Sequence, residues 1–219
     1  TITGYTGAIE NPVIPDTIEG LPVTAIGYRA FSGRTDITGS LTLPSTLETI
    51  GDEAFYQCSA LTGDLVIPEG VTSIGYLAFY WCPGFDGTLT LPSTLASIGD
   101  YAFYECSGLD GTLTLPSTLE TIGDHAFEYC SGLTGDLVIH DGVTSIGDYA
   151  FGSCSGFDGS LTLPSTLATI GNSVFYGCSG LTGNLVIPEG VTSIGDDAFY
   201  GCSGLTGDLE IPEGVTSIG

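Results

Sequence analysis

The stretch Ile50–Gly75, IGDEAFYQCSALTGDLVIPEGVTSIG, decides the fold because its pattern recurs along the whole chain. The Ile-Gly pair that opens and closes this stretch returns with a constant step of 24 residues, from Ile26 to Ile218. A period of this length is the sequence signature of a solenoid, in which each repeat buries its apolar side only against its two neighbours. The 219 residues therefore predict one continuous stack of coils rather than globular domains with separate cores.

Each unit begins with an apolar stripe that follows the Ile-Gly pair. Four apolar residues recur at helical spacing for about two turns, which predicts a short helical or 3₁₀ turn at this place. These residues are Ala54, Phe55, Cys58 and Leu61. Gly63, which has a counterpart in all eight units, follows the stripe. A left-handed backbone angle there would cost any other residue energy, so we expect the chain to turn at this glycine.

The second half of each unit has the pattern of a β-strand. Apolar residues alternate over residues 65–67, so that Leu65 and Ile67 are expected to face the core and Val66 the solvent. Pro68 ends this strand, because proline cannot donate the next ladder hydrogen bond, and Ile74 returns the chain to the core. Stacked units predict a leucine-rich-repeat type of β-solenoid, a right-handed stack of about eight 24-residue coils with short parallel strands in register.

The charge of the chain argues against two classes of partner. Arg29 and Arg34 are opposed by 26 aspartates and glutamates, and the formal net charge is -24. Phosphate backbones and anionic lipid surfaces are bound by clusters of Lys and Arg, which this sequence lacks. We therefore expect neither nucleic-acid binding nor direct binding to an anionic membrane. No apolar run approaches the roughly 20 residues that a membrane-spanning helix needs.

The unit from Leu185 to Leu205 resembles the BspA-like leucine-rich repeat family. It fills each place of the approximate family pattern Leu-x-Ile-Pro-x-x-Val-x-x-Ile-Gly-x-x-Ala-Phe-x-x-Cys-x-x-Leu, and the resemblance covers essentially the whole chain. It implies that residues 1–27 form an N-terminal capping unit and residues 28–219 the tandem repeats. The family resemblance further implies an extracellular or cell-surface protein, of bacterial or protist type, that attaches to host or neighbouring cells. Three residues depart from the pattern without threatening the fold, namely Arg34, His140 and Val174.

Nothing in the sequence predicts catalysis. Enzyme active sites need singular constellations of residues, and these units are too alike to supply one. His125 and His140 stand alone, and no serine or cysteine has a recognisable base and orienting acid. We therefore expect a protein without enzymatic activity, cofactor or dedicated metal site.

Seven cysteines form a column with the same 24-residue step, and their spacing separates three interpretations. Zinc and redox sites use closely spaced pairs such as Cys-x-x-Cys, which are absent. Equivalent positions of stacked coils would lie about 5 Å apart, which permits disulfides between neighbours. We favour a buried ladder of reduced thiols with a structural role, since cysteine is a common small buried residue. Its members are Cys58, Cys82, Cys106, Cys130, Cys154, Cys178 and Cys202.

An acidic column follows the Ile-Gly pairs, with Tyr76 and Asn172 as interruptions. Its members are Asp52, Asp100, Asp124, Asp148 and Asp196. Stacked carboxylates repel one another, and a weakly bound divalent cation would relieve that repulsion. Aspartate after glycine also commonly caps turns and helices, and this is the interpretation that we favour.

Variable aromatic positions are the best candidates for a binding surface. The columns of Glu53, Tyr56 and Gln57 change most along the stack and carry tyrosines that are expected on the exposed side of the predicted helical turn. Exposed aromatic rings can stack on sugars or anchor a protein partner, although they can also simply pack on their neighbours. The candidate contact residues are Tyr80, Trp81, Tyr101, Tyr104 and Tyr129.

Three functional hypotheses follow. The first is a non-catalytic binding or adhesion module for an unidentified protein or glycan partner on a host or neighbouring cell. The second is a structural stalk or self-assembling extracellular fibre, favoured by the near-identical units. The third is an ice- or surface-binding ladder, which we rank last because valine interrupts its threonine column. That column comprises Thr42, Thr90, Thr114 and Thr162.

Overall fold

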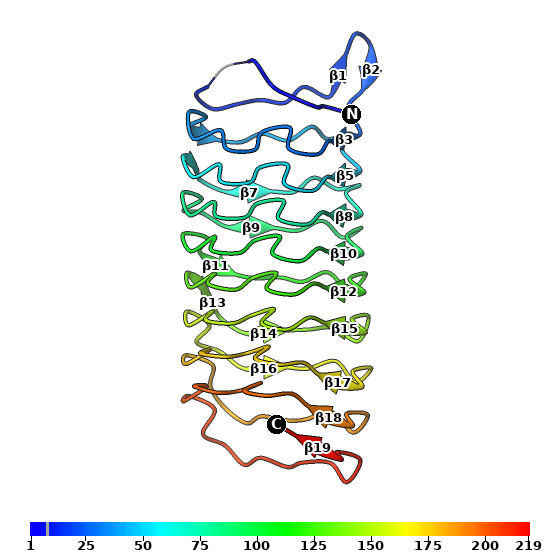
Figure 1. The fold of residues 1–219 in the computed structure, drawn as a ribbon, viewed down its shortest axis with the longest axis vertical. Coiled ribbons are helices and arrows are strands. Elements are labelled where there is room, and N and C mark those ends of the chain that lie inside the picture. Colours follow the sequence, from blue (N-terminus) through cyan, green and yellow to red (C-terminus); the bar gives the residue numbers. More distant parts are fainter. Residues whose placement is uncertain (8) are drawn as a thin grey trace.

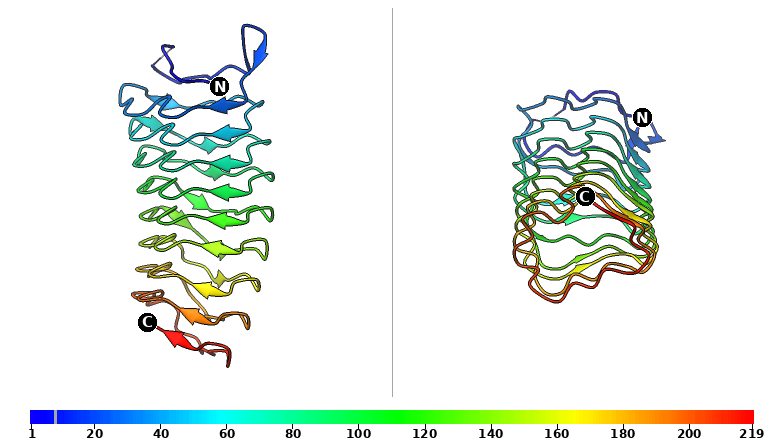
Figure 2. Two further views of the ribbon diagram at one scale, coloured as in Figure 1. Left: turned by 45° about the vertical axis from the view of Figure 1, so that its right-hand side comes forward. Right: turned by 60° about the horizontal axis from the view of Figure 1, so that its bottom comes forward.

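The chain forms a single stack of coils, as the 24-residue period predicts. The computed structural model describes residues 1–7 and 9–219. The two termini lie at opposite ends of the stack (Figure 1). Viewed obliquely from one end, successive coils follow nearly the same outline (Figure 2, right). The β-solenoid is thereby confirmed. No described segment forms a helix long and apolar enough to cross a membrane.

The most continuous sheet is formed by the residues that precede each glycine of the Ile-Gly pairs. Its strands are two residues long, parallel, and shifted by one repeat, so that Ile50 is paired with Ile26 and Ile74. From sequence, Ile74 was expected only to return the chain to the core, so this ladder is additional to the predicted one. Six strands form one sheet, β3 (Ala25–Ile26), β5 (Thr49–Ile50), β8 (Ser73–Ile74), β10 (Ser97–Ile98), β12 (Thr121–Ile122) and β15 (Ser145–Ile146), and three form another, β17 (Thr169–Ile170), β18 (Ser193–Ile194) and β19 (Ser217–Ile218).

The predicted strand at residues 65–67 is present and has the expected faces. Leu65 and Ile67 are buried, whereas Val66 is 50% exposed. Shorter parallel pairs occur here and at the turn before it. They are β7 (Leu65–Val66) with β9 (Leu89–Thr90), β14 (Leu137–Val138) with β16 (Leu161–Thr162), β4 (Gly39–Ser40) with β6 (Leu61–Thr62), and β11 (Gly111–Thr112) with β13 (Leu133–Thr134). Gly63 has a φ of 78°, which confirms the left-handed turn.

The predicted helical or 3₁₀ turn is wrong, since residues 1–7 and 9–219 contain no helix. Backbone N–H groups alternate between two kinds of partner. The amide of Phe55 donates to the carbonyl oxygen of Ala78 in the next coil at 2.7 Å, whereas the amide of Cys58 closes a local turn onto Phe55 at 3.1 Å. A helix would use every N–H locally. Stacking instead offers every second N–H a carbonyl group in the neighbouring coil.

Two columns of this turn have left-handed backbone angles. The column of Glu53 has φ between 53° and 57° in all eight units, and that of Gln57 is left-handed as well. Neither column contains a β-branched residue, whose side chain would clash most in this conformation. Left-handed residues thus recur four positions apart in this turn, and the amides of both columns donate to the next coil. The first column comprises Arg29, Glu53, Leu77, Tyr101, His125, Tyr149, Ser173 and Asp197.

The core is organised around a ladder of phenylalanines. Their rings stack in parallel with centroids 4.8 to 5.8 Å apart, because the coil spacing matches the separation that offset-stacked rings prefer. The ladder comprises Phe31, Phe55, Phe79, Phe103, Phe127, Phe151, Phe175 and Phe199.

The cysteine column lies beside these rings as seven buried, free thiols. Each S–H donates to the carbonyl oxygen of the phenylalanine 27 residues earlier, at 3.0 to 3.1 Å. Burial raises the pKa of the Cys106 thiol to about 12. The thiols therefore act as hydrogen-bond donors between coils.

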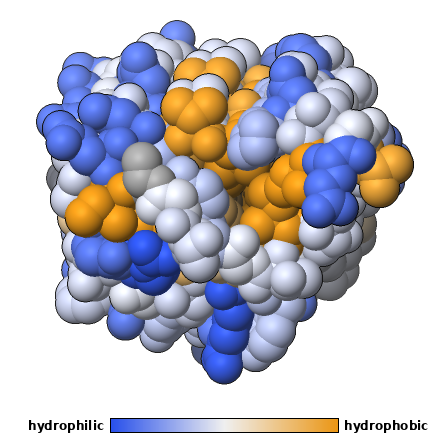
Figure 3. All heavy atoms as spheres, turned by 90° about the horizontal axis from the view of Figure 1, so that it is seen from above, coloured by the Kyte–Doolittle hydropathy of each residue, from blue (hydrophilic) through white to orange (hydrophobic). Residues whose placement is uncertain are grey.

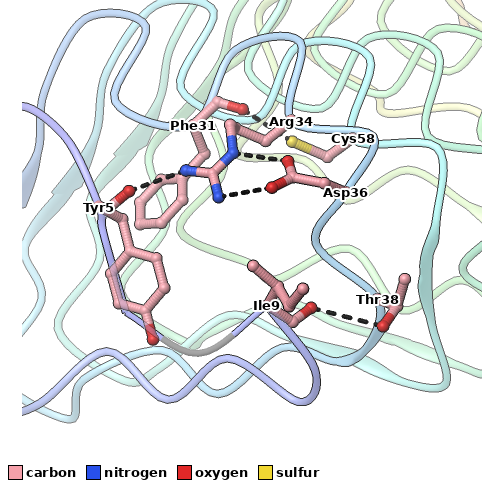
Figure 4. Close-up of polar contacts among 7 residues, drawn as sticks. All are labelled: Tyr5, Ile9, Phe31, Arg34, Asp36, Thr38 and Cys58. Carbon is pink, nitrogen blue, oxygen red and sulfur yellow. Dashed lines mark hydrogen bonds and ion pairs between the residues drawn. The ribbon is translucent and has the colours of Figure 1, made fainter.

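Arg34 joins the N-terminal segment to the first full coil, in addition to backbone hydrogen bonds such as that from the amide of Ile14 to the carbonyl oxygen of Thr42. Arg34 stands in the cysteine column, and its Nη1 donates to the carbonyl oxygen of Tyr5 at 2.8 Å while its Nε contacts Asp36 at 2.6 Å (Figure 4). Tyr5 in turn packs on Phe31 with a centroid distance of 5.3 Å. Arg34 thus makes the contact to the preceding coil that a thiol makes elsewhere in the stack.

A hairpin interrupts this first unit between Pro15 and Ile26. It consists of the antiparallel strands β1 (Thr17–Ile18) and β2 (Leu21–Pro22), and it projects beyond the stack (Figure 1). Apolar residues remain on the surface of this end of the molecule (Figure 3), with Val13 59% and Leu21 70% exposed.

Candidate functional site

Eight aromatic rings form one connected surface along the turns that follow the Ile-Gly pairs. Each ring has its centroid 4.4 to 6.3 Å from that of at least one other ring in the group. We call this group the tyrosine face. It comprises Tyr56, Tyr76, Tyr80, Tyr101, Tyr104, His125, Tyr129 and Tyr149.

Two stacked ladders make up most of the tyrosine face. Tyr80 lies between Tyr56 and Tyr104, at centroid distances of 5.1 and 4.9 Å with nearly parallel rings. The second ladder lies in a left-handed column, where Tyr101 and His125 stack at 4.4 Å. Tyr101 also contacts Tyr104 at 5.6 Å and so joins the two ladders. The repeat spacing places like rings at stacking distance wherever two consecutive units carry an aromatic residue.

Four of the five residues singled out from sequence belong to this network. Tyr80, Tyr101 and Tyr104 are half-buried by their neighbours, and Tyr129 is 43% exposed at the end of a T-shaped contact with Tyr104. Trp81 is also 43% exposed but makes no ring contact with the described residues. Packing and exposure therefore coexist. Stacking covers the ring faces of the ladders, whereas Trp81 and Tyr129 present open surface.

His125 is not isolated, in contrast to its appearance in the sequence. Its ring lies between those of Tyr101 and Tyr149, and its Nδ1 is 2.5 Å from Oε2 of Glu128. The three ring-bearing residues share one 24-residue column, and Glu128 follows His125 by three positions. Reading each column for consecutive planar side chains would have revealed this cluster.

Carboxylates surround the rings. Burial raises the pKa of Glu128, and the hydrogen bond from His125 opposes this shift. Burial, followed by the charge of Glu128, raises the pKa of Tyr104 to about 12, and Glu105 adds to the same effect. The phenol of Tyr104 therefore stays protonated at neutral pH and can both donate and accept hydrogen bonds.

Trp81, Glu105 and Tyr129 belong to a third column of the turn, the one that contains Gln57. These residues occupy the same place in three successive coils, and all have left-handed φ angles, of 55°, 55° and 62°. Equivalent backbone conformation directs their side chains alike. An acidic side chain therefore stands between two exposed aromatic ones, one coil step from each.

The aspartate column has a structural task in the described residues. Asp52 Oδ1 accepts a hydrogen bond from the amide of Tyr76 at 2.9 Å, and Asp100 Oδ1 accepts one from Asp124. These carboxylates cap turns, as favoured from sequence, but the turn that each caps belongs to the next coil. No group of three or more potential metal ligands converges within residues 1–7 and 9–219.

Comparison with known proteins places the chain among leucine-rich repeats. The profile of the BspA type leucine rich repeat region matches residues 24–158 and 133–219. A leucine rich repeat protein of T. pallidum is 29% identical, with a TM-score of 0.62 over 92% of this chain and 80% of its own. A leucine rich cell surface protein of Faecalibacterium prausnitzii is 24% identical, with a TM-score of 0.45 over 99% of this chain and 89% of its own. No curated protein matches the chain.

Proposed function

The chain belongs to the BspA type leucine rich repeat family, and from this premise we propose that it is a non-catalytic module that binds a macromolecular partner through its repeat surface. In this chain the greatest variation coincides with the tyrosine face. A protein or glycan on a host or neighbouring cell is the proposed partner.

The observation that carries this proposal is the tyrosine face itself. Tyrosine and tryptophan supply large, rigid contact area at low entropic cost and are enriched among residues that dominate binding energy. Here they lie on a backbone whose amides are paired within and between coils, so little ordering energy is lost on binding. The rings form an extended surface rather than an enclosed cavity, which suits a macromolecule.

A place at the cell surface or in secreted form belongs to the same proposal. It is supported by the resemblance to surface and secreted BspA-like proteins. Attachment of one cell to another requires many weak contacts over an extended surface, which a solenoid supplies.

Binding arrays test the proposal. The purified chain is applied to printed glycans and to extracellular matrix proteins, and binders are retested with the double variant Trp81→Ala/Tyr104→Ala. The matched control is Tyr176→Ala/Tyr200→Ala, which removes a stacked tyrosine pair outside the tyrosine face, with centroids 5.2 Å apart. We expect a binder that is lost on the first pair and kept on the second. Arrays without any binder, or equal loss with both pairs, would contradict the proposal.

A second candidate function is self-assembly into a stalk or fibre. It is favoured by the near-identical units, whose repeated faces can pack on one another, and by the apolar hairpin, on which Leu21 is 70% exposed. Sedimentation velocity and electron microscopy test this candidate. Concentration-dependent end-to-end assemblies would support it, and a monomer at all concentrations would exclude it.

A further inference from the structure

We propose that Trp81, Glu105 and Tyr129 form a seat for one cationic side chain, lysine or arginine, of a partner protein. This inference rests on the proposed binding function and specifies the chemistry of the partner. The Tyr80–Tyr104 ladder lies beside the seat as its wall, because these two tyrosines belong to the same coils as Trp81 and Glu105.

The spacing of the seat suits a cation. Coils in this stack repeat at the distance of the stacked phenylalanines, about 5 Å, so that Trp81 and Tyr129 lie roughly 10 Å apart on either side of Glu105. A cation held by Glu105 would then be about 5 Å from each ring. Cation–π attraction operates within about 6 Å of a ring centroid. Trp81 makes no ring contact with the described residues and Tyr129 makes only a T-shaped one with Tyr104, and each is 43% exposed, so a cation can reach both rings.

The acceptors around the seat match the donors of a cationic side chain. A guanidinium or ammonium group has only donors, and the Glu105 carboxylate has only acceptors. Burial raises the pKa of Tyr80 and Tyr104, and the charge of Glu105 adds to both shifts, so both phenols lie within the electrostatic range of this carboxylate. The Glu105 side chain makes no hydrogen bond with the described residues, so it is available to a ligand.

The chain contains its own example of the same chemistry. At the N-terminal end of the stack, Nε of Arg29 donates to Oε2 of Glu53 at 2.7 Å, while its guanidinium lies 5.0 Å from the ring centroid of Tyr28. A carboxylate and an aromatic ring on these turns thus hold an arginine. Arg29 and Arg34 are the only lysine or arginine residues of the sequence. A cation for Glu105 must therefore come from another molecule.

Overall charge supports a cationic protein segment over a glycan. A net charge of -24 attracts basic segments over long range and speeds their association. Neutral sugars gain nothing from that field, and acidic sugars are repelled by it. Stacking on sugars also needs uncovered ring faces, which the two tyrosine ladders do not offer.

A synthetic peptide of six Gly-Arg repeats is a suitable probe, with a peptide of six Gly-citrulline repeats as its uncharged isostere. Trp81 is the single tryptophan, so its emission reports binding at the seat. Titration calorimetry supplies the affinity of each variant. We expect the arginine peptide to bind and to change Trp81 emission, and the citrulline peptide to do neither.

Charge-matched variants separate the seat from diffuse attraction. Glu105→Gln and Glu120→Gln each remove one negative charge, but only the first lies in the seat. We expect about a tenfold weaker affinity for Glu105→Gln and less than about a twofold change for Glu120→Gln. Tyr129→Ser should also weaken binding severalfold, whereas Tyr176→Ser should leave it unchanged. Equal losses within either pair, or unchanged Trp81 emission, would overturn the proposal.

The outcome for the seat is separable from that for the proposed function. One outcome is a natural partner that no longer binds Trp81→Ala/Tyr104→Ala but still binds Glu105→Gln as tightly as the unmodified chain. That result would contradict the cation seat and leave the proposed binding function intact. A glycan partner would do the same. Blank arrays count against the proposed function itself.

Discussion

The amide nitrogen of Asp148 donates a hydrogen bond to Oδ1 of Asp124, one coil earlier, at 2.8 Å. The same bond recurs one coil earlier, where the amide of Asp124 donates to Oδ1 of Asp100 at 2.9 Å. Two acidic residues are thus joined through a backbone N–H, in a column where their charges alone would repel. Much of the acidity of this chain is built into the contacts between coils.

Replacement of Asp124 separates its charge from its hydrogen bond. Asn172 occupies the same column and accepts from the amide of Asp196 at 3.0 Å, which shows that an amide oxygen suffices. We expect Asp124→Asn to preserve stability and Asp124→Ala to lose roughly 1 kcal/mol, the usual cost of removing a cap. Urea unfolding followed by circular dichroism measures both. Equal destabilisation by Asn and Ala would show that the charge, rather than the cap, matters.

Acid should weaken the stack through a second set of caps. Amides and hydroxyls of the following coil lower the pKa of Asp64, Asp136 and Asp141. A carboxylate with a depressed folded pKa stabilises fully above its unfolded pKa, about 3.9, and this stabilisation is lost as the pH falls through the lower folded pKa. We therefore expect Tm to fall between about pH 4 and pH 2.

The variant Asp136→Asn tests this pH dependence, because its amide oxygen accepts the same bonds without titrating. Its Tm should fall less on acidification than that of the unmodified chain. Glu120→Gln, which removes one charge without a cap, should follow the unmodified chain. The explanation fails if Asp136→Asn loses Tm as steeply as the unmodified protein.

The left-handed positions should reject β-branched residues. Leu77 has a φ of 54°, and this conformation costs an ordinary residue roughly 1–2 kcal/mol relative to glycine. Leu77→Val should destabilise the chain by about 1–2 kcal/mol, because branching at Cβ increases the clash. Leu77→Asn should be tolerated or stabilising, since asparagine adopts this region readily. Thermal unfolding of the two variants gives the comparison, and a Val variant as stable as the Asn variant would refute the argument.

The thiols of the cysteine ladder should react very slowly with thiol reagents in the folded protein. Six of the thiols are fully buried, and Cys202 is 9% exposed with a pKa raised to about 11 by burial. A thiol-specific reagent at neutral pH should therefore label none of the cysteines rapidly. Among the slow reactions, that of Cys202 should be the fastest. All seven should react after denaturation without reductant. Fewer than seven under those conditions would reveal disulfides.

The fold could be predicted from the sequence to a large extent. The 24-residue step specifies a stack, the alternation at Leu65, Val66 and Ile67 specifies inside and outside, and Gly63 marks a turn. These are local or periodic properties, and they hold whatever the spacing of the coils. The exposure of Trp81 and Tyr129 was also predicted, whereas a role of the aromatic columns in binding stays a prediction.

The helical turn was the part that local pattern predicted wrongly. The apolar spacing of Ala54, Phe55, Cys58 and Leu61 is compatible with a helix, but the partner of each amide is decided by competition between its own turn and the next coil. Carbonyl groups such as that of Ala78 become available only once the coils are stacked. Period and burial were therefore determined by the sequence itself, whereas the hydrogen-bond partners, the ring network around Tyr101 and His125, and the seat at Glu105 were decided by tertiary structure, because residues 24 positions apart become neighbours only when the coil spacing is set.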